Sequence, residues 1–162
     1  MQFHATPYDI SAVGFYFETV EEFAENSASH KTGHDGPVEE YEIQVIDGES
    51  HEVAICEALG INQGNIAEIV DYIESLDQWD VIKAEAAAAL GILQLNTDLD
   101  DIDVYEVDTL EELAEQFVDE GLFGDIPDNL TNYIDYAAIG RDLRFDYSIE
   151  NLNGKNYAIR AG

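Results

Sequence analysis

The sequence predicts an α+β fold built from short strands and short acidic helices. Apolar residues recur every three to four positions in some segments and every second position in others, which indicates both kinds of element. Of the 162 residues, 46% are hydrophobic and 10% aromatic, with only 3 Pro. This is enough apolar material to oppose the disorder that a net charge of -30 would favour. We therefore expect a folded chain with more than one small core.

In the first part of the chain, residues 1–97, the sequence predicts three helices and one strand. Residues 19–28 (TVEEFAENSA) open with the Thr-x-x-Glu spacing of a capping box and form a short helix. Residues 40–46 (EYEIQVI) alternate in polarity, which is typical of a half-buried strand with an acidic outer face. Residues 65–76 form an amphipathic helix. After a break, residues 77–89 continue as a helix in which Trp79 is apolar.

The remainder predicts a strand, two helices and a hairpin. Residues 101–107 alternate in part and form the strand, and residues 109–120 (TLEELAEQFVDE) are the clearest helix, again with a capping box. A second helix is expected from about residue 127 to 138, with Gly140 as its end. Residues 143–160 alternate on both sides of an Asn-Gly pair, which is a type I′ turn signal and predicts a hairpin.

The charge excludes several classes of function. With 36 Asp+Glu against 6 Lys+Arg, the chain has no basic face for a nucleic acid or an anionic membrane. The acidic residues are concentrated in residues 1–140, whereas four of the six basic residues lie in the last 22. The sequence has no apolar run of 18 residues, no secretory signal and a single cysteine, so we expect a cytoplasmic protein without disulfides.

The chain offers no convincing catalytic or metal site. His30 and His34 have helical spacing, but Lys-Thr-Gly separates them and indicates a loop. One acidic stretch resembles part of an EF-hand calcium loop and contains Asp98, Asp100, Asp101 and Asp103. In neither possible frame does the sequence have the Gly and the Glu that such a loop requires. Cys56 stands among small apolar neighbours and is expected to be buried. We expect no enzyme, no metal and no cofactor.

The acidic residues destabilise the folded chain, which suggests that they serve a function. Glu111–Glu115, Glu115–Asp119 and Glu21–Glu25 are like-charge pairs one helical turn apart, each destabilising by roughly 0.2–0.5 kcal/mol. A charge of -30 equals that of roughly 50 Å of duplex DNA, so short acidic helices could resemble a phosphate backbone. Two alternatives stay open: adaptation to high salt, and an acidic interaction module with an unknown protein partner.

One segment carries a resemblance to a known family. Residues 121–143 (GLFGDIPDNLTNYIDYAAIGRDL) resemble the signature segment of the ArdA antirestriction family, and the acidic helix before them resembles the helix that precedes this motif. Glu39-Glu40-Tyr41 with Asp47 resembles the family's N-terminal region more loosely. The motif carries over as Pro127, Leu130, Tyr133, Asp135, Tyr136, Gly140, Arg141, Asp142 and Leu143.

The resemblance implies an elongated, curved chain of up to three small α+β domains. The corresponding divisions here are a divergent N-terminal domain (1–50), a mainly helical middle domain (51–97) and a C-terminal domain with the motif and the hairpin (98–162). Such proteins form homodimers that resemble bent DNA. They occupy the DNA-binding cleft of type I restriction-modification enzymes, chiefly the methyltransferase core, and block restriction of incoming mobile DNA without catalysis or cofactor.

The resemblance and the charge together predict a spread-out binding surface. The motif is expected to be structural or dimer-forming, or else to contact the enzyme directly. Single neutralisations should do little, because the charge is redundant. The candidate phosphate mimics are Glu40, Glu42, Glu68, Asp71, Glu74, Asp77, Asp80, Asp98, Asp100, Asp101, Asp103, Glu111, Glu112, Glu115, Asp119 and Glu120.

Overall fold

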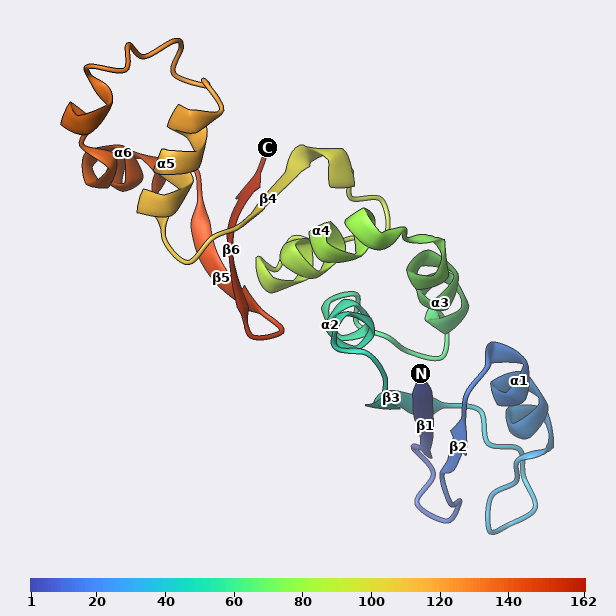
Figure 1. Cartoon of the computed structure of the whole chain (residues 1–162). Helices are drawn as coiled ribbons and strands as arrows, with labels where there is room; N and C mark the ends of the chain where they lie inside the picture. The colour runs from blue at the N-terminus through green and yellow to red at the C-terminus, as the bar shows by residue number, and fades with distance from the viewer. The chain divides into compact units, whose positions relative to one another are not determined.

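The chain folds into two compact units, Met1–Thr97 and Asp98–Gly162. A computed structural model describes all residues from 1 to 162. Each unit holds one three-stranded antiparallel sheet together with helices (Figure 1), so the α+β class is confirmed. The finer division of the chain into three domains stays a prediction. None of the helices is both long enough and apolar enough to cross a membrane.

The sheet of the first unit has β1 (Gln2–Pro7) at its centre. It pairs on one side with β2 (Phe15–Phe17) and on the other with β3 (Tyr41–Asp47), both antiparallel. Phe3 lies opposite Phe17 in this register, and both side chains are buried with their rings stacked 5.2 Å apart. The strand expected at residues 40–46 is therefore confirmed as β3, whereas β1 and β2 were not predicted.

Aromatic rings join α1 (Val20–Ser29) to this sheet. The ring of Phe23 lies 5.2 Å from that of Phe17 and 5.6 Å from that of Tyr41. The helix begins as its capping pattern predicts, because the Glu22 N–H donates to the hydroxyl of the N-cap residue Thr19 at 3.1 Å. Ring packing thus supplies much of the contact between this helix and the sheet.

Three helices complete the first unit: α2 (Ser50–Ala58), α3 (Ile66–Ser75) and α4 (Gln78–Ala89). The helices expected at 65–76 and 77–89 are confirmed as α3 and α4, whereas α2 was not predicted. Helices α2 and α4 pack together, and each brings small buried side chains to the core: Cys56 in α2, and Ala84, Ala86 and Ala87 in α4. Small residues allow the helix backbones to approach closely.

Cys56 is fully buried, as its neighbours predict. Burial, together with the charges of Glu52 and Glu57, raises the pKa of its thiol to about 11. A nucleophilic cysteine needs the opposite shift, because the thiolate is the reactive form. Cys56 is therefore a packing residue.

The sheet of the second unit has β6 (Lys155–Ala161) between β4 (Ile102–Glu106) and β5 (Ser148–Leu152). The Asn-Gly turn between β5 and β6 has φ values of 55° at Asn153 and 83° at Gly154, as a type I′ turn requires. The predicted hairpin is confirmed, although its first strand begins only at Ser148. A short 3-10 turn, η1 (Leu99–Asp101), precedes β4.

Helix α5 (Leu110–Asp119) covers this sheet and confirms the helix expected at 109–120. Leu113 and Phe117 of the helix form a buried cluster with Tyr147 and Ala158. The hydroxyl of Thr109 accepts the Glu112 N–H at 3.2 Å. The helix thus begins with the same threonine N-cap as α1.

The prediction of a helix at 127–138 is wrong. Residues 122–135 are turns with one short 3-10 helix, η2 (Thr131–Tyr133), and the α-helix that follows is α6 (Tyr136–Leu143). The physical reason is the N-cap: the carboxylate of Asp135 accepts the Ala138 N–H at 2.9 Å, so the helix starts nine residues later than expected, at Tyr136.

Gly140 does not end a helix, because it lies buried inside α6. A Cβ atom at this position would lie 3.0 Å from the backbone N of Glu111 and from the carbonyl C and O of Leu110. The first turn of α5 therefore packs directly on the backbone of α6, and a glycine permits this contact (Figure 1).

Gly140→Ala should destabilise the protein by about 1–3 kcal/mol, because the added methyl group meets backbone atoms that cannot rotate away. Helix propensity alone predicts a gain of about 1 kcal/mol, so the sign of the change separates the two effects. Urea unfolding measures it. Ala137→Gly, on the exposed side of the same helix, is the control for propensity. An unchanged or raised free energy of unfolding for Gly140→Ala would contradict the packing role.

Candidate functional site

The helix α5 separates an apolar face from an acidic one. Leu113 and Phe117 are buried, whereas Glu111, Glu115 and Asp119 are exposed. These three carboxylates are four residues apart in sequence, so they follow one another along the helix at roughly 5–6 Å per step. The helix presents a row of negative charges at a spacing that the sequence predicts.

Two further elements expose carboxylates opposite buried apolar side chains, one carboxylate on β3 and three on α3. On β3, Tyr41 and Ile43 point into the core, whereas Glu42 is exposed on the opposite face. On α3, three isoleucines are buried and three acidic residues are exposed. All but two of the predicted phosphate mimics are exposed, the exceptions being the half-buried Asp80 and Asp103.

Some of these carboxylates also bind backbone N–H groups. The Asp77 carboxylate accepts the N–H groups of Trp79 and Asp80 at 2.8 and 2.9 Å, and these bonds hold its pKa below the ordinary value. Glu112 accepts the Asp108 N–H at 2.8 Å, and Asp98 accepts that of Asp100 at 3.0 Å. These side chains cap helical turns, so their substitution would change the fold as well as the surface charge.

Asp103 is neutralised within the chain. Its carboxylate pairs with the guanidinium of Arg160, whose Nε lies 2.8 Å from Oδ2. On the same strand, Glu106 pairs with Lys155 at 2.9 Å. Both cations come from β6, the strand next to β4. The structure thus uses two of the six basic residues to hold this sheet, and Asp103 carries no free charge for a partner.

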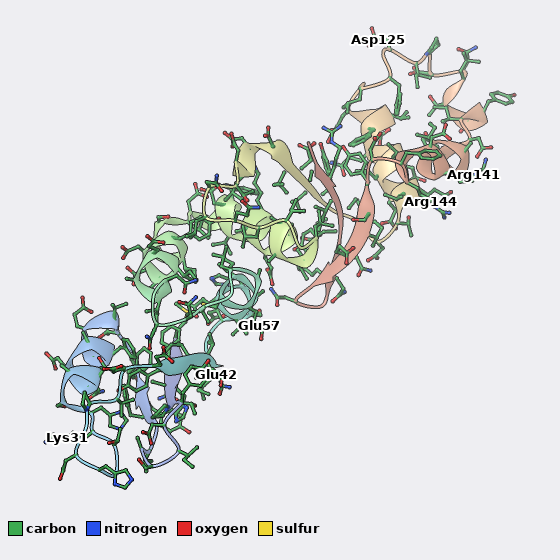
Figure 2. All side chains as sticks on the ribbon, turned by 180° about the vertical axis from the view of Figure 1, so that it is seen from behind. Lys31, Glu42, Glu57, Asp125, Arg141 and Arg144 are labelled. Atoms are coloured by element: carbon green, nitrogen blue, oxygen red, sulfur yellow. The ribbon has the colours of Figure 1, made fainter.

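The two other basic residues of the C-terminal stretch lie on one helix. Arg141 and Arg144 stand at the end of α6 (Figure 2) and line a hollow of about 580 Å³ with Leu110 and Ile149. Asp108 and Glu111 line the same hollow, so its charges are mixed.

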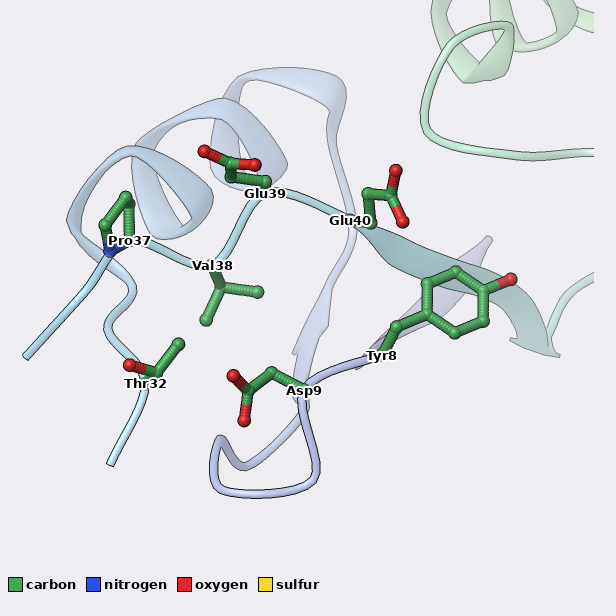
Figure 3. Close-up of a pocket in the computed structure, with 7 residues that line it drawn as sticks. All are labelled: Tyr8, Asp9, Thr32, Pro37, Val38, Glu39 and Glu40. Carbon is green, nitrogen blue, oxygen red and sulfur yellow. The ribbon is translucent and has the colours of Figure 1, made fainter. Parts of the chain in front are cut away.

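A second hollow, of about 330 Å³, lies in the first unit and is lined in part by Asp9, Glu39 and Glu40. Figure 3 shows the carboxylates of Glu39 and Glu40 pointing away from that of Asp9. The Asp9 carboxylate instead accepts the hydroxyl and the N–H of Ser11 at 2.6 and 2.8 Å, which lowers its pKa. The hollow is therefore not a convergent set of cation ligands.

No group of three or more His, Cys, Asp or Glu side chains is arranged to hold a metal ion. His30 lies at the end of α1, where its Nδ1 makes a hydrogen bond of 2.9 Å with the hydroxyl of Tyr41. His34 lies in the following turn. The first histidine of the pair is thus part of the aromatic core.

The structure divides the family motif into two parts. Its first part is an exposed segment, in which Leu130 and Tyr133 are 49% and 83% accessible. Its second part belongs to the fold: Asp135 caps α6, Gly140 packs on α5, and Leu143 contacts the buried cluster. Of the remaining motif residues, Pro127, Arg141 and Asp142 are exposed and Tyr136 is half-buried.

The sequence did not show which apolar side chains would be exposed. Leu122 and Phe123 precede the motif and are 58% and 53% accessible, and Trp79 on α4 is 76% accessible. Periodicity places Trp79 among the apolar residues of its helix. Its exposure depends on the packing of α4 in the folded unit, which is tertiary information.

Asp77→Asn keeps an N-cap acceptor but removes the titrating group. Because the pKa of folded Asp77 lies below 3.8, the native state binds this proton less tightly than the unfolded chain. The stability that the charged form adds is complete above about pH 4 and is lost as the pH falls through the folded pKa. Melting temperatures should therefore show an advantage of the wild type over the variant that shrinks below about pH 4. A difference that stays constant in acid would contradict this role.

Comparison with known proteins yields one family. A family model described as "Antirestriction protein (ArdA)" matches residues 15–156 of the chain. A search of curated proteins found no match. The matched range begins at β2 and ends at the start of β6, and it includes the acidic face of α5 and the whole motif.

Proposed function

Because the chain belongs to the ArdA antirestriction protein family, we propose that it acts as a DNA mimic. In this proposal it occupies the DNA-binding cleft of a type I restriction-modification enzyme, chiefly the methyltransferase core. Antirestriction activity follows from the family. DNA mimicry, the type I target and the protection of incoming mobile DNA in the cytoplasm are the proposed detail.

The observation that carries the proposal is the row of exposed carboxylates on α5. Its charges repeat along a rigid element, as phosphates repeat along a strand. A cleft that binds DNA carries lysine and arginine side chains placed for such a repeat. The acidic face of α3 and the exposed Glu42 on β3 add further negative charge. The proposed role is that of an inhibitor that needs no catalysis and no cofactor.

Binding of this kind depends on electrostatics. A mimic that takes the place of phosphates releases the counterions that both surfaces hold, so its affinity should fall with salt. Opposite charges also accelerate the encounter of the two proteins. The negative charge that opposes folding of the inhibitor therefore raises both its association rate and its affinity.

The decisive experiment is a competition titration against a type I methyltransferase bound to its labelled target DNA, at two salt concentrations. We expect displacement near one inhibitor dimer per enzyme, weakening as the salt rises. Absence of displacement at both concentrations would refute DNA mimicry. If the protein then also needed molar salt to fold, adaptation to high salt would explain its acidity.

A paired variant tests the α5 face. Glu111→Gln/Glu115→Gln should weaken displacement, because each exposed charge pair lost costs about 0.2–1 kcal/mol and the salt dependence falls with the number of contacts. Glu21→Gln/Glu25→Gln on α1 is the matched control, because it removes the same charge from a pair with the same spacing outside the predicted surface. Equal losses for both variants would show that net charge alone determines binding.

We also propose that the chain forms a homodimer through the exposed part of the motif. Leu130 and Tyr133 are accessible apolar side chains next to the least acidic part of the chain, where repulsion between two copies is weakest. Tyr133→Glu should convert a dimer into a monomer in sedimentation equilibrium. Tyr16→Glu, an exposed tyrosine of the first unit, should leave the dimer intact. A monomeric wild type would refute the proposal.

A further inference from the structure

The apolar face of α4 continues beyond the core that it covers. Ala86 is fully buried, and Trp79 lies seven residues before it, nearly two helical turns away and on the same face. Yet Trp79 is 76% accessible. The tryptophan is therefore not needed to fill the core of this unit, and its large ring is available to a partner.

Acidic side chains surround this position in the sequence. Glu74, Asp77 and Asp80 stand against one cation, Lys83, so the local charge is negative. The Asp77 carboxylate is held at the N-terminus of α4, because it accepts the backbone N–H of Trp79 at 2.8 Å. Asp77 is exposed and Asp80 is half-buried, so both carboxylates add negative charge to the end of the helix that carries the tryptophan.

An exposed indole in an acidic region suits one kind of cationic side chain. The face of an indole attracts cations more strongly than that of any other aromatic residue. Arginine has a planar and weakly hydrated guanidinium that stacks on rings and binds carboxylates at the same time. The ammonium group of lysine is compact and strongly hydrated, so it gains less from the ring.

We propose that Trp79 stacks on an arginine side chain of the partner's DNA-binding cleft, which the negative charge at this end of α4 attracts. This inference rests on the proposed function and adds a contact that phosphate mimicry does not include. The contact selects arginine over lysine, and the indole face on which the arginine stacks carries no formal charge. It therefore contributes affinity that survives at higher salt, where the carboxylate contacts weaken.

Two substitutions separate stacking from simple apolar burial. Trp79→Phe keeps a weaker aromatic face, and Trp79→Leu keeps apolar bulk without one. In the competition titration we expect Trp79→Leu to be about 3- to 30-fold weaker than the wild type and Trp79→Phe to lie between them. The salt dependence should be the same for all three. Melting temperatures verify that each variant is folded, as expected for an exposed position.

Equal displacement by all three proteins would overturn the inference and leave the proposed function standing. If the wild type itself displaced no DNA, the proposed function would fail, and a second measurement would still decide on arginine recognition. The chain has a single tryptophan, so its fluorescence reports on Trp79 alone. An acetylated, amidated hexa-arginine peptide should change this emission at lower concentration than the equivalent hexa-lysine peptide. Equal responses to the two peptides would overturn the preference for arginine.

Discussion

The scarcity of cations is the constraint on which the rest of this structure depends. With 36 carboxylates and 6 basic side chains, most negative charges have no side chain of opposite charge to pair with. The backbone takes that role at the beginnings of the helices, where N–H groups lack partners and the helix dipole favours negative charge. Asp77 and Asp135 cap their helices directly. In α1 and α5 a threonine forms the cap, and a glutamate three residues later binds an earlier N–H group.

Placing carboxylates at helix N-termini favours many short helices over a few long ones. Short helices offer many N-termini per residue, and each N-terminus accommodates acidic side chains that would otherwise only repel one another. The last turns of α1 to α5 contain no basic residue, so the helices are stabilised from one end only. Small units that bury less of their surface must then fold on tightly packed cores. The rings around Phe23 and the cluster around Phe117 provide such cores. Few ion pairs remain, and two of them join neighbouring strands of the second sheet.

The sequence was informative where local signals agreed and failed where they competed. The helix α5 and the β5–β6 turn follow from capping, periodicity and an Asn-Gly pair, all of which are local. The segment before α6 has an equally good periodic pattern, but the N-cap at Asp135 prevails over it. Gly140 seemed to be a helix end because glycine often is one, and only the contact with α5 gives its real role. For the candidate surface, periodicity placed the acidic residues on exposed faces correctly. It could not show that Arg160 neutralises Asp103, because that ion pair depends on strand order.

The role of the carboxylates in capping helices supports their proposed role in binding a partner. A carboxylate that binds backbone N–H groups cannot swing freely, so its position is fixed before any partner arrives, and a fixed charge loses less entropy on binding. Asp77 is such a group, and it caps the helix that carries the exposed Trp79. Glu111 and Glu115 on α5 are exposed and have long, adaptable side chains, which suits contacts that tolerate small differences in spacing. In the proposed function, fixed and adaptable charges both serve to bind a cleft built for the regular but deformable backbone of DNA. The same shortage of cations that shapes the fold therefore leaves the surface ready for a cationic partner.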